Sequence, residues 1–208
     1  LAPHCVLEKS GLKYEFIEVN IARDTERDPE YLKLNPHGRI PTLVFEDTVI
    51  IESAAISIYL ADKHSNTELS PRLDHPDRAS YIQWMVYITN TLQETMTQKL
   101  YTYKYSDDPE CRDHVASRAS SKLNMIIEFL EESIGKTGGP FFLESGLSTA
   151  DIYLHMLTAW DPSIKERVLS SSSTSTRPPE KRLINIEHSY HEMLKQPAIS
   201  NTFIQNGH

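Results

Sequence analysis

The sequence predicts a small α/β domain followed by a longer all-α domain. Runs of aromatic and β-branched residues, which are typical of strands, occur only in the first third of the chain. Further along, apolar residues recur every three or four positions, the spacing of a helix with one buried face. A polar stretch containing prolines separates the two regions. We therefore expect the α/β domain at residues 1–65 and an all-α helical bundle at residues 77–208.

The chain begins in a region with the pattern of a helix. Ala2, Cys5 and Val6 recur at helical spacing. Gly11 is well placed to end this helix, because glycine readily adopts the left-handed conformation found after helix C-termini. The run YEFIEV at residues 14–19 is rich in aromatic and β-branched residues and predicts a strand.

A short helix at residues 29–34, a hairpin and a longer helix complete the α/β domain. The sequence PTLVFEDTVII, residues 41–51, has two apolar runs joined by polar residues, which predicts two paired strands. The sequence ESAAISIYLADKH, residues 52–64, keeps apolar residues at helical spacing. This domain is small and lacks an opening strand, so we expect it to need a partner surface and expect further residues before Leu1.

The all-α domain is predicted to contain two long helices followed by three others. The two apolar faces are formed by Tyr81, Trp84, Met85, Ile88 and Leu92, and by Ala119, Leu123, Ile126, Ile127 and Leu130. In STADIYLHMLTAW, Ser148 and Asp151 have the spacing of a capping box that opens the third helix. A final helical pair is expected at residues 187–195 and 197–204. The Ser-rich stretch at 170–179 is expected to form a surface loop.

Composition and charge argue against several kinds of partner. A net charge of −8, with no dense block of Lys and Arg, argues against a nucleic-acid surface. No apolar run approaches the roughly 20 residues needed to cross a bilayer, and no signal segment opens the chain, so we expect no membrane partner. Two cysteines in 208 residues favour a reduced, cytoplasmic protein.

The sequence NPHGRIPTLVF, residues 35–45, places a proline just before a predicted strand. One interpretation is that Pro41 lies at a sheet edge, where its missing N–H costs no ladder hydrogen bond. The other starts from Gly38 and Pro41, which bracket Ile40. If the Ile40–Pro41 bond is cis, the N–H and C=O of Ile40 face away from the sheet. They are then free to bind an extended peptide through backbone hydrogen bonds.

Glu52 and Ser53 stand at the start of the predicted helix that follows the hairpin. A helix N-terminus leaves amide N–H groups unpaired and carries a partial positive charge, so it accommodates a carboxylate. Ser53 adds a hydroxyl donor and Glu52 matches an ammonium group. Together they suit the zwitterionic end of an amino acid. The alternative is that both side chains cap the helix and bind nothing.

Three sequences carry a resemblance to a known family: NPHGRIPTL, IESAAISIYLADKH and STADIYL. In order and spacing they resemble the cytosolic glutathione transferases, and LAPHCVLEKSG resembles the first helix of the beta-class members. The resemblance implies a thioredoxin-like N-terminal domain and an all-α C-terminal helical-bundle domain. It also implies glutathione as co-substrate, no metal, a small hydrophobic electrophile as second substrate and a homodimer.

The resemblance further implies roles for individual residues. The backbone of Ile40 would pair with the cysteinyl unit of glutathione, with Pro41 in the cis form. Glu52 and Ser53 would hold the γ-glutamyl end. Arg39 would reach the glycyl carboxylate, a role that suits a guanidinium. The STAD sequence would be a structural capping motif and not part of the catalytic site.

The sequence also departs from the family pattern. The Ser, Tyr or Cys that activates the thiol in this family would lie shortly before Leu1, so no catalytic residue is assigned. Cys5 shares an apolar helix face and is expected to be a packing residue, and His4 is no better supported as a catalytic group. Val86 and Gln93 stand where beta-class members carry Asn and His.

The function expected from these features is that of a glutathione transferase. The enzyme would stabilise the glutathione thiolate and direct it at an electrophile held against the helical domain. An apolar pocket lined by Tyr87, Thr91, Met96 and Tyr101 is one interpretation of those residues, and ordinary helix packing is the other. The first alternative function is a glutathione-dependent double-bond isomerase. The second is a non-catalytic module that keeps the fold for protein association.

Overall fold

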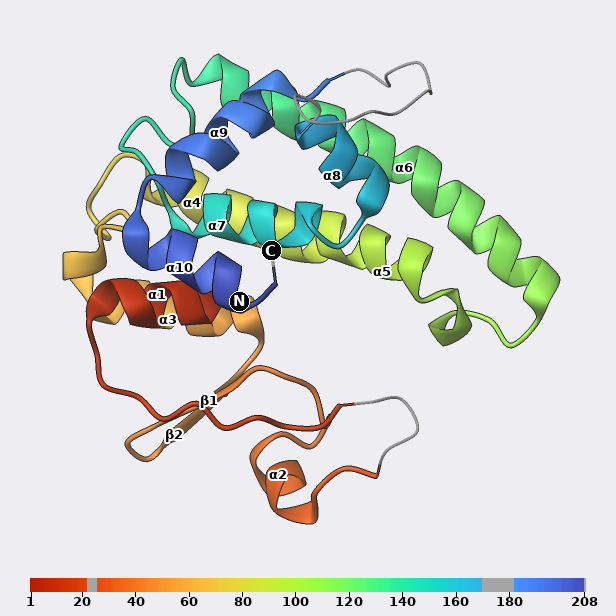
Figure 1. The fold of residues 1–208 in the computed structure, drawn as a ribbon, viewed down its shortest axis with the longest axis horizontal. Coiled ribbons are helices and arrows are strands. Elements are labelled where there is room, and N and C mark those ends of the chain that lie inside the picture. Colours follow the sequence, from red (N-terminus) through yellow and green to blue (C-terminus); the bar gives the residue numbers. More distant parts are fainter. Residues whose placement is uncertain (22–25, 170–181, 208) are drawn as a thin grey trace.

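The computed structural model describes residues 1–21, 26–169 and 182–207. In Figure 1 a small α/β part lies below a larger body of helices. Within the described residues, the elements of the α/β part are α1 (Ala2–Ser10), α2 (Pro29–Leu34), β1 (Thr42–Phe45), β2 (Thr48–Ile51) and α3 (Ser53–Lys63). The expected helices, the hairpin and the end of α1 at Gly11, which has a φ of 71°, are confirmed.

The helical part begins after a short 3-10 turn. Its elements are η1 (Ser65–Thr67), α4 (Arg78–Tyr87), η2 (Ile88–Gln93), α5 (Glu94–Leu100), η3 (Thr102–Lys104), α6 (Pro109–Lys136), α7 (Thr149–Thr158), α8 (Pro162–Val168), α9 (Ile184–Leu194) and α10 (Pro197–Gln205). The two long helices and the final pair are confirmed. The sequence did not predict α8 or the π-helical turn η2, which joins α4 to α5. The expected loop at 170–179 lies outside the described residues.

The strand predicted at residues 14–19 is wrong. This segment has no regular secondary structure, and Phe16 and Ile17 are 69% and 72% exposed. The sheet formed by the described residues has two strands, with β1 antiparallel to β2 and Thr42 opposite Ile51. A strand is stable only where a neighbour accepts and donates its backbone hydrogen bonds. Residues 14–19 have the composition of a strand, but no strand of the described residues pairs with them.

One apolar core joins the α/β part to the helical part. Cys5 and Val6 on α1 and Ile56 and Leu60 on α3 are almost fully buried and belong to the same cluster as the inward faces of α4, α6 and α7. Helix α1 contacts α3, α7 and α10, and these helices lie together in Figure 1. The small part therefore rests on a helical surface, as expected. The proposed boundary between residues 65 and 77 stays a prediction.

None of the described helices is both long and apolar enough to cross a bilayer.

The capping box at the start of α7 is confirmed. The Ser148 hydroxyl oxygen accepts a hydrogen bond from the Ala150 N–H at 3.2 Å. The Asp151 carboxylate accepts hydrogen bonds from the Ser148 N–H at 2.8 Å and from the Phe142 N–H at 3.0 Å. Asp151 is fully buried, so these bonds satisfy backbone groups that water does not reach. They also fix the loop before α7 onto the helix.

Replacing Asp151 with Ala should lower the free energy of unfolding by about 3 kcal/mol, because two buried N–H groups lose a charged acceptor. Chemical denaturation followed by circular dichroism measures this value. Asp113→Ala is the matched control, since Asp113 is exposed on α6 and should change stability by less than about 0.5 kcal/mol. Equal losses in the two variants would contradict the capping role.

Candidate functional site

The loop before β1 makes the sharp turn that the sequence predicts. The Ile40–Pro41 peptide bond is cis. Gly38 is buried with a φ of 59°, a left-handed conformation that favours glycine. A Cβ atom at this position would lie 2.9 Å from Cγ of Arg27, so the turn has no space for a larger residue. The Gly38 carbonyl accepts a hydrogen bond from Nε of Arg27 at 3.1 Å.

Hydrogen bonds from the side chains of Tyr31 and Asn35 fix this loop. The Tyr31 hydroxyl and the Asn35 side-chain amide both donate to the Arg39 carbonyl, at 2.5 and 2.7 Å. Both also contact the Thr42 hydroxyl, at 2.8 and 3.2 Å. Asn35 is almost fully buried, so its amide is committed to these contacts. Neither residue was predicted to support the site, although an Asn between a helix end and a proline is a signal for such a turn.

The backbone of Ile40 makes no hydrogen bond to the described residues. Its side chain is half exposed. Arg39 beside it is also exposed. Burial and a hydrogen bond to Glu94 raise the pKa of Tyr105 to about 12, while Arg39 acts in the opposite direction. The Arg39 charge therefore acts on the Tyr105 hydroxyl.

Glu52 and Ser53 form the second half of the site. Glu52 has a φ of 70° and a ψ of 113°, a conformation that non-glycine residues rarely adopt. Its side chain makes no capping hydrogen bond to α3. The Ser53 hydroxyl instead contacts the Tyr153 hydroxyl at 2.5 Å. The interpretation that these side chains cap the helix is therefore wrong, and the first-turn amides of α3 have no side-chain cap.

Tyr153 and Gln93, both in the helical part, were not predicted to belong to this site. Tyr153 on α7 contacts Ser53 and donates its hydroxyl proton to Oε1 of Gln93 at 2.8 Å. Burial raises the pKa of Tyr153, and the nearby Glu52 carboxylate acts in the same direction. Sequence separation hides this contact, since Ser53 and Tyr153 are 100 positions apart. The feature of the sequence that could have indicated this contact is the tyrosine in the helix that begins at STAD.

Cys5 and His4 are not suited to activate a thiol. Cys5 is fully buried in the core, and burial raises the pKa of its thiol to about 12. The thiol therefore stays protonated at neutral pH, which confirms Cys5 as a packing residue. Nε2 of His4 contacts the Tyr14 hydroxyl at 2.6 Å, and that hydroxyl donates to Glu8. The Cys5 sulfur therefore packs in the core, and the His4 imidazole bonds to Tyr14.

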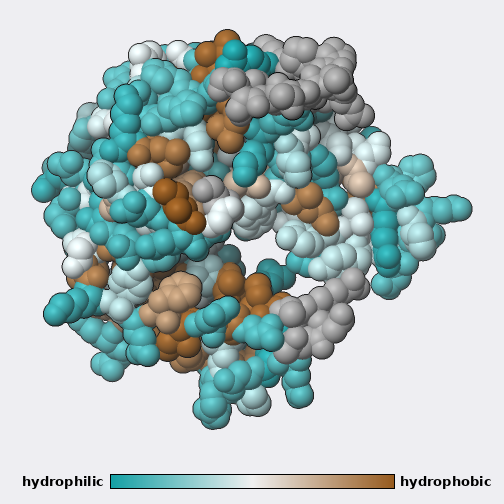
Figure 2. Space-filling model, viewed as in Figure 1, coloured by the Kyte–Doolittle hydropathy of each residue, from teal (hydrophilic) through white to brown (hydrophobic). Residues whose placement is uncertain are grey.

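The residues suggested as a second pocket are only partly available. Met96 is fully buried, so it belongs to the core and its assignment to a pocket surface is wrong. Tyr87 and Thr91 are half-buried, and Tyr101 is exposed after α5. Figure 2 shows the molecule hollowed between the helical part and the small α/β part, with hydrophobic side chains gathered along the lower edge. The hollow separates the α/β elements from the end of α5.

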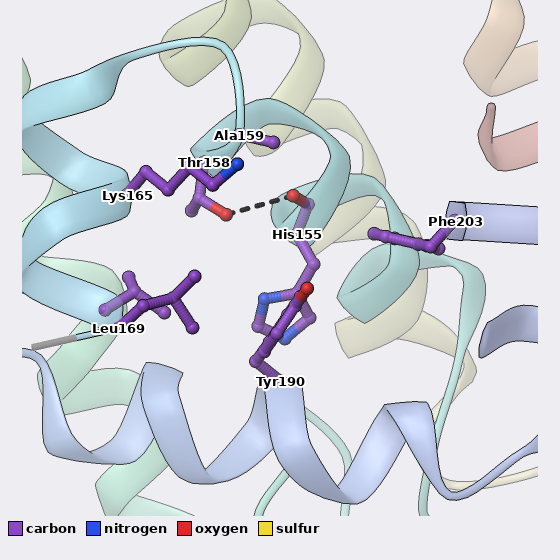
Figure 3. A pocket seen from close by; sticks show the side chains of 8 residues that line it. His155, Thr158, Ala159, Lys165, Leu169, Tyr190 and Phe203 are labelled. Atoms are coloured by element: carbon purple, nitrogen blue, oxygen red, sulfur yellow. Dashed lines mark hydrogen bonds between the residues drawn. The ribbon is translucent and has the colours of Figure 1, made fainter. Parts of the chain in front are cut away.

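A small cavity lies elsewhere, within the helical part (Figure 3). It has a volume of about 20 Å³ and is bounded by side chains of α7, α8, α9 and α10, among them His155, Lys165 and Tyr190. Two positions along a helix correspond to a rotation of about 200°, so Tyr153 and His155 project from opposite faces of α7. The cavity is therefore separate from the site at Ser53. Nε2 of His155 contacts the Ser189 hydroxyl at 3.0 Å.

Comparison with known proteins follows the same division of the chain. The family profile described as "Glutathione S-transferase, N-terminal domain" matches residues 1–62. The chain is 27% identical over 167 residues to "Glutathione S-transferase GstA" of Escherichia coli O157:H7, which covers 79% of both chains. It is 30% identical over 148 residues to "Glutathione S-transferase 1" of Dianthus caryophyllus, covering 71% of this chain and 66% of the relative. The "zeta class" protein of Euphorbia esula is 27% identical over 71% of this chain and 64% of its own length.

Solved structures share the whole fold. A glutathione transferase homolog from Sulfitobacter, described with bound glutathione, has a TM-score of 0.77 at 22% identity, covering 99% of this chain and 92% of that one. A sphingomonad glutathione S-transferase complexed with glutathione has a TM-score of 0.75 at 21% identity, covering 99% and 93%. The expected thioredoxin-like domain with an all-α C-terminal domain is confirmed. The chain belongs to the glutathione S-transferase family of enzymes.

His155 should make stability depend on pH. Burial lowers its pKa to about 3, so the folded protein holds it neutral. Because the unfolded state takes up a proton near pH 6.5, the stability that this group contributes is present above pH 6.5 and is lost as pH falls towards 3. We expect this loss to reach about 3 kcal/mol at pH 4.

The measurement is the free energy of unfolding at pH 7 and pH 4 for wild type and His155→Gln, which does not titrate. The wild type should lose about 3 kcal/mol more than the variant over this interval. His114→Gln, at an exposed position on α6, is the control and should follow the wild type. Parallel losses in all three proteins would show that His155 does not set the acid sensitivity.

Proposed function

We propose that this protein is a glutathione transferase that binds glutathione along Ile40 and α3. The observation that carries the proposal is that the half-exposed Ile40, next to the cis Pro41, makes no backbone hydrogen bond to the described residues. An extended tripeptide adds to such an edge through its own backbone. Its cysteinyl unit would pair with Ile40, next to the cis Pro41.

The charges around Ile40 match the two ends of glutathione. The γ-glutamyl end carries a carboxylate and an ammonium group. The uncapped first turn of α3 and the Ser53 hydroxyl suit the carboxylate, and the Glu52 carboxylate suits the ammonium group. At the other end, the exposed Arg39 suits the glycyl carboxylate, which a guanidinium can bind in a bidentate manner. The solved structures described with bound glutathione support this ligand.

The proposed reaction is attack of the glutathione thiolate on a small hydrophobic electrophile. A free thiol has a pKa near 8.5, and lowering it by about 2 units requires about 2.7 kcal/mol of preferential thiolate stabilisation. The hollow between the two parts of the molecule offers space for the electrophile next to the glutathione sulfur. The thiol-activating residue that the family resemblance places before Leu1 stays a prediction.

A glutathione-dependent isomerase is the second candidate. The same thiolate would add to a conjugated double bond and leave after rotation about the single bond, so glutathione is recovered. The similarity to a plant zeta-class glutathione S-transferase is compatible with this activity. Both reactions use the same glutathione site. In transfer the sulfur stays bonded to the product, and in isomerisation it leaves.

A homodimer and a cytoplasmic location also stay predictions. The dimer is supported by exposed apolar side chains on two adjacent helices, since Val86 on α4 is 49% exposed and Met125 and Phe129 on α6 are 66% and 42% exposed. Phe129 lies against Tyr87 with ring centroids 5.4 Å apart, so α4 and α6 meet at these two rings.

Turnover experiments separate the candidates. Free glutathione is followed together with the second substrate, using an aryl halide for transfer and a conjugated cis alkene for isomerisation. Stoichiometric loss of glutathione indicates transfer, which is the expected result, and an unchanged concentration with product formation indicates isomerisation. Binding of glutathione without turnover of either class would favour the non-catalytic association module.

Ser53→Ala should weaken glutathione binding about tenfold, because the γ-glutamyl end loses a hydrogen bond to a charged group. Isothermal calorimetry measures the affinity and thermal unfolding checks the fold. Ser65→Ala removes the same hydroxyl from an exposed position in η1 and should bind like the wild type. If millimolar glutathione gave no heat of binding with the wild type, the proposed function would be wrong.

A further inference from the structure

The small cavity of the helical part is bordered by a buried polar atom that has no partner among the described residues. This atom is Nδ1 of His155 on α7, and the residue is fully buried. The other ring nitrogen, Nε2, contacts the Ser189 hydroxyl on α9 at 3.0 Å. Figure 3 shows the imidazole beside the open space that Thr158 and Leu169 also border. A buried polar group without a hydrogen bond is costly, so we expect Nδ1 to meet a ligand in this space.

The hydrogen-bond partners determine which ring nitrogen carries the proton. Burial lowers the pKa of His155 to about 3, so the imidazole is neutral at neutral pH and has a single N–H. Ser189 is also fully buried, and Nε2 of His155 is the hydrogen-bonding contact of its hydroxyl among the described residues. If Nε2 carried the proton, the Ser189 proton and the Nδ1 lone pair would both lack a partner. If Ser189 donates to Nε2, only the Nδ1–H needs one, so the proton belongs on Nδ1.

The cavity wall supplies a second polar partner one turn further along α7. The Thr158 hydroxyl donates to the His155 carbonyl at 3.0 Å, which is the dashed line in Figure 3. Its proton is therefore used, and its oxygen lone pairs can still accept a hydrogen bond. Thr158 is 5% exposed and lines the same cavity. A ligand that satisfies both groups has to accept a hydrogen bond from the Nδ1–H and donate one to Thr158.

We propose that this cavity is a binding site for one water molecule, which accepts a hydrogen bond from the Nδ1–H of His155 and donates one to the Thr158 hydroxyl. A water molecule accepts and donates at the same time, and in a buried site it needs at least two polar partners. It also needs roughly 10–15 Å³ of space, and the cavity offers about 20 Å³. The site is thus large enough for water and too small for a drug-sized ligand.

Other occupants fit this site less well. A metal ion needs several ligating side chains, and the described residues that line the cavity include one imidazole and no carboxylate or thiolate. An apolar occupant would leave the Nδ1–H without an acceptor. With water bound, each donor from Ser189 through His155 and the water to Thr158 meets an acceptor. This hydration site lies in the helical part and does not depend on the proposed glutathione site.

Two measurements on the wild type test the proposal. NMR of isotope-labelled histidine distinguishes protonated from bare ring nitrogens, and comparison with His155→Gln identifies the signals of His155. We expect the proton on Nδ1, with a nuclear Overhauser effect between this proton and bound water. A crystal structure at high resolution should show a water oxygen roughly 2.7–3.2 Å from Nδ1 of His155 and from Oγ1 of Thr158.

Thr158→Val removes the acceptor of the water and keeps the shape of the side chain. The nuclear Overhauser effect to water should be lost, and the equilibrium constant for unfolding should rise about tenfold. Thr97→Val is the matched control, because the Thr97 hydroxyl donates to the Gln93 carbonyl of its own helix at 2.9 Å and does not line the cavity. It should keep the nuclear Overhauser effect and change the unfolding constant by less than about threefold.

Three results would overturn the inference. A proton on Nε2 would mean that His155 offers no donor to the cavity. A wild type with no water density beside Nδ1 and no nuclear Overhauser effect to water would have a dry cavity. An unchanged effect in Thr158→Val would show that Thr158 does not hold the water. If Thr158→Val does not fold, the two wild-type measurements decide the question by themselves.

Discussion

The complete burial of α7 is the constraint on which the rest of the structure depends. All ten residues from Thr149 to Thr158 are buried, so every side chain of this helix has to find a partner inside the protein. Its N-terminus is satisfied by Asp151, and its apolar residues join the core shared with α1 and α4. Only its polar side chains remain to be accommodated. Tyr153 is satisfied by Ser53 and Gln93, and Nε2 of His155 contacts Ser189, whereas the buried Nδ1 of His155 has no hydrogen-bond partner among the described residues.

The two halves of the candidate site differ in how they are supported. Ile40 is presented by a turn whose contacts are local, since Tyr31, Asn35 and Thr42 all lie within a few positions of it. Ser53 is supported across the junction of the small and helical parts. In the proposed complex, the cysteinyl unit would therefore contact the α/β part alone, and the γ-glutamyl end would contact a serine that the helical part supports.

The same distinction explains what could be predicted from the sequence. The turn at Gly38 and Pro41, the hairpin and the capping box follow from residues near one another, and all three are confirmed. The predicted strand at residues 14–19 failed because strand composition needs a neighbouring strand. The pairing of Ser53 with Tyr153 was not predicted because hydroxyl groups carry no periodic signal. Only the packing of α3 against α7 brings them together.

The π-helical turn η2 has a consequence for how this region tolerates change in length. It accommodates one residue more per turn than the flanking helices, so deleting a residue there would restore regular winding between α4 and α5. One residue corresponds to a rotation of about 100° around the helix axis. The shorter helix would direct either the core face of α4 or the side chain that meets the α7 phenol towards solvent. Deleting one residue would thus disrupt either the packing of α4 or the hydrogen bond between Tyr153 and Gln93.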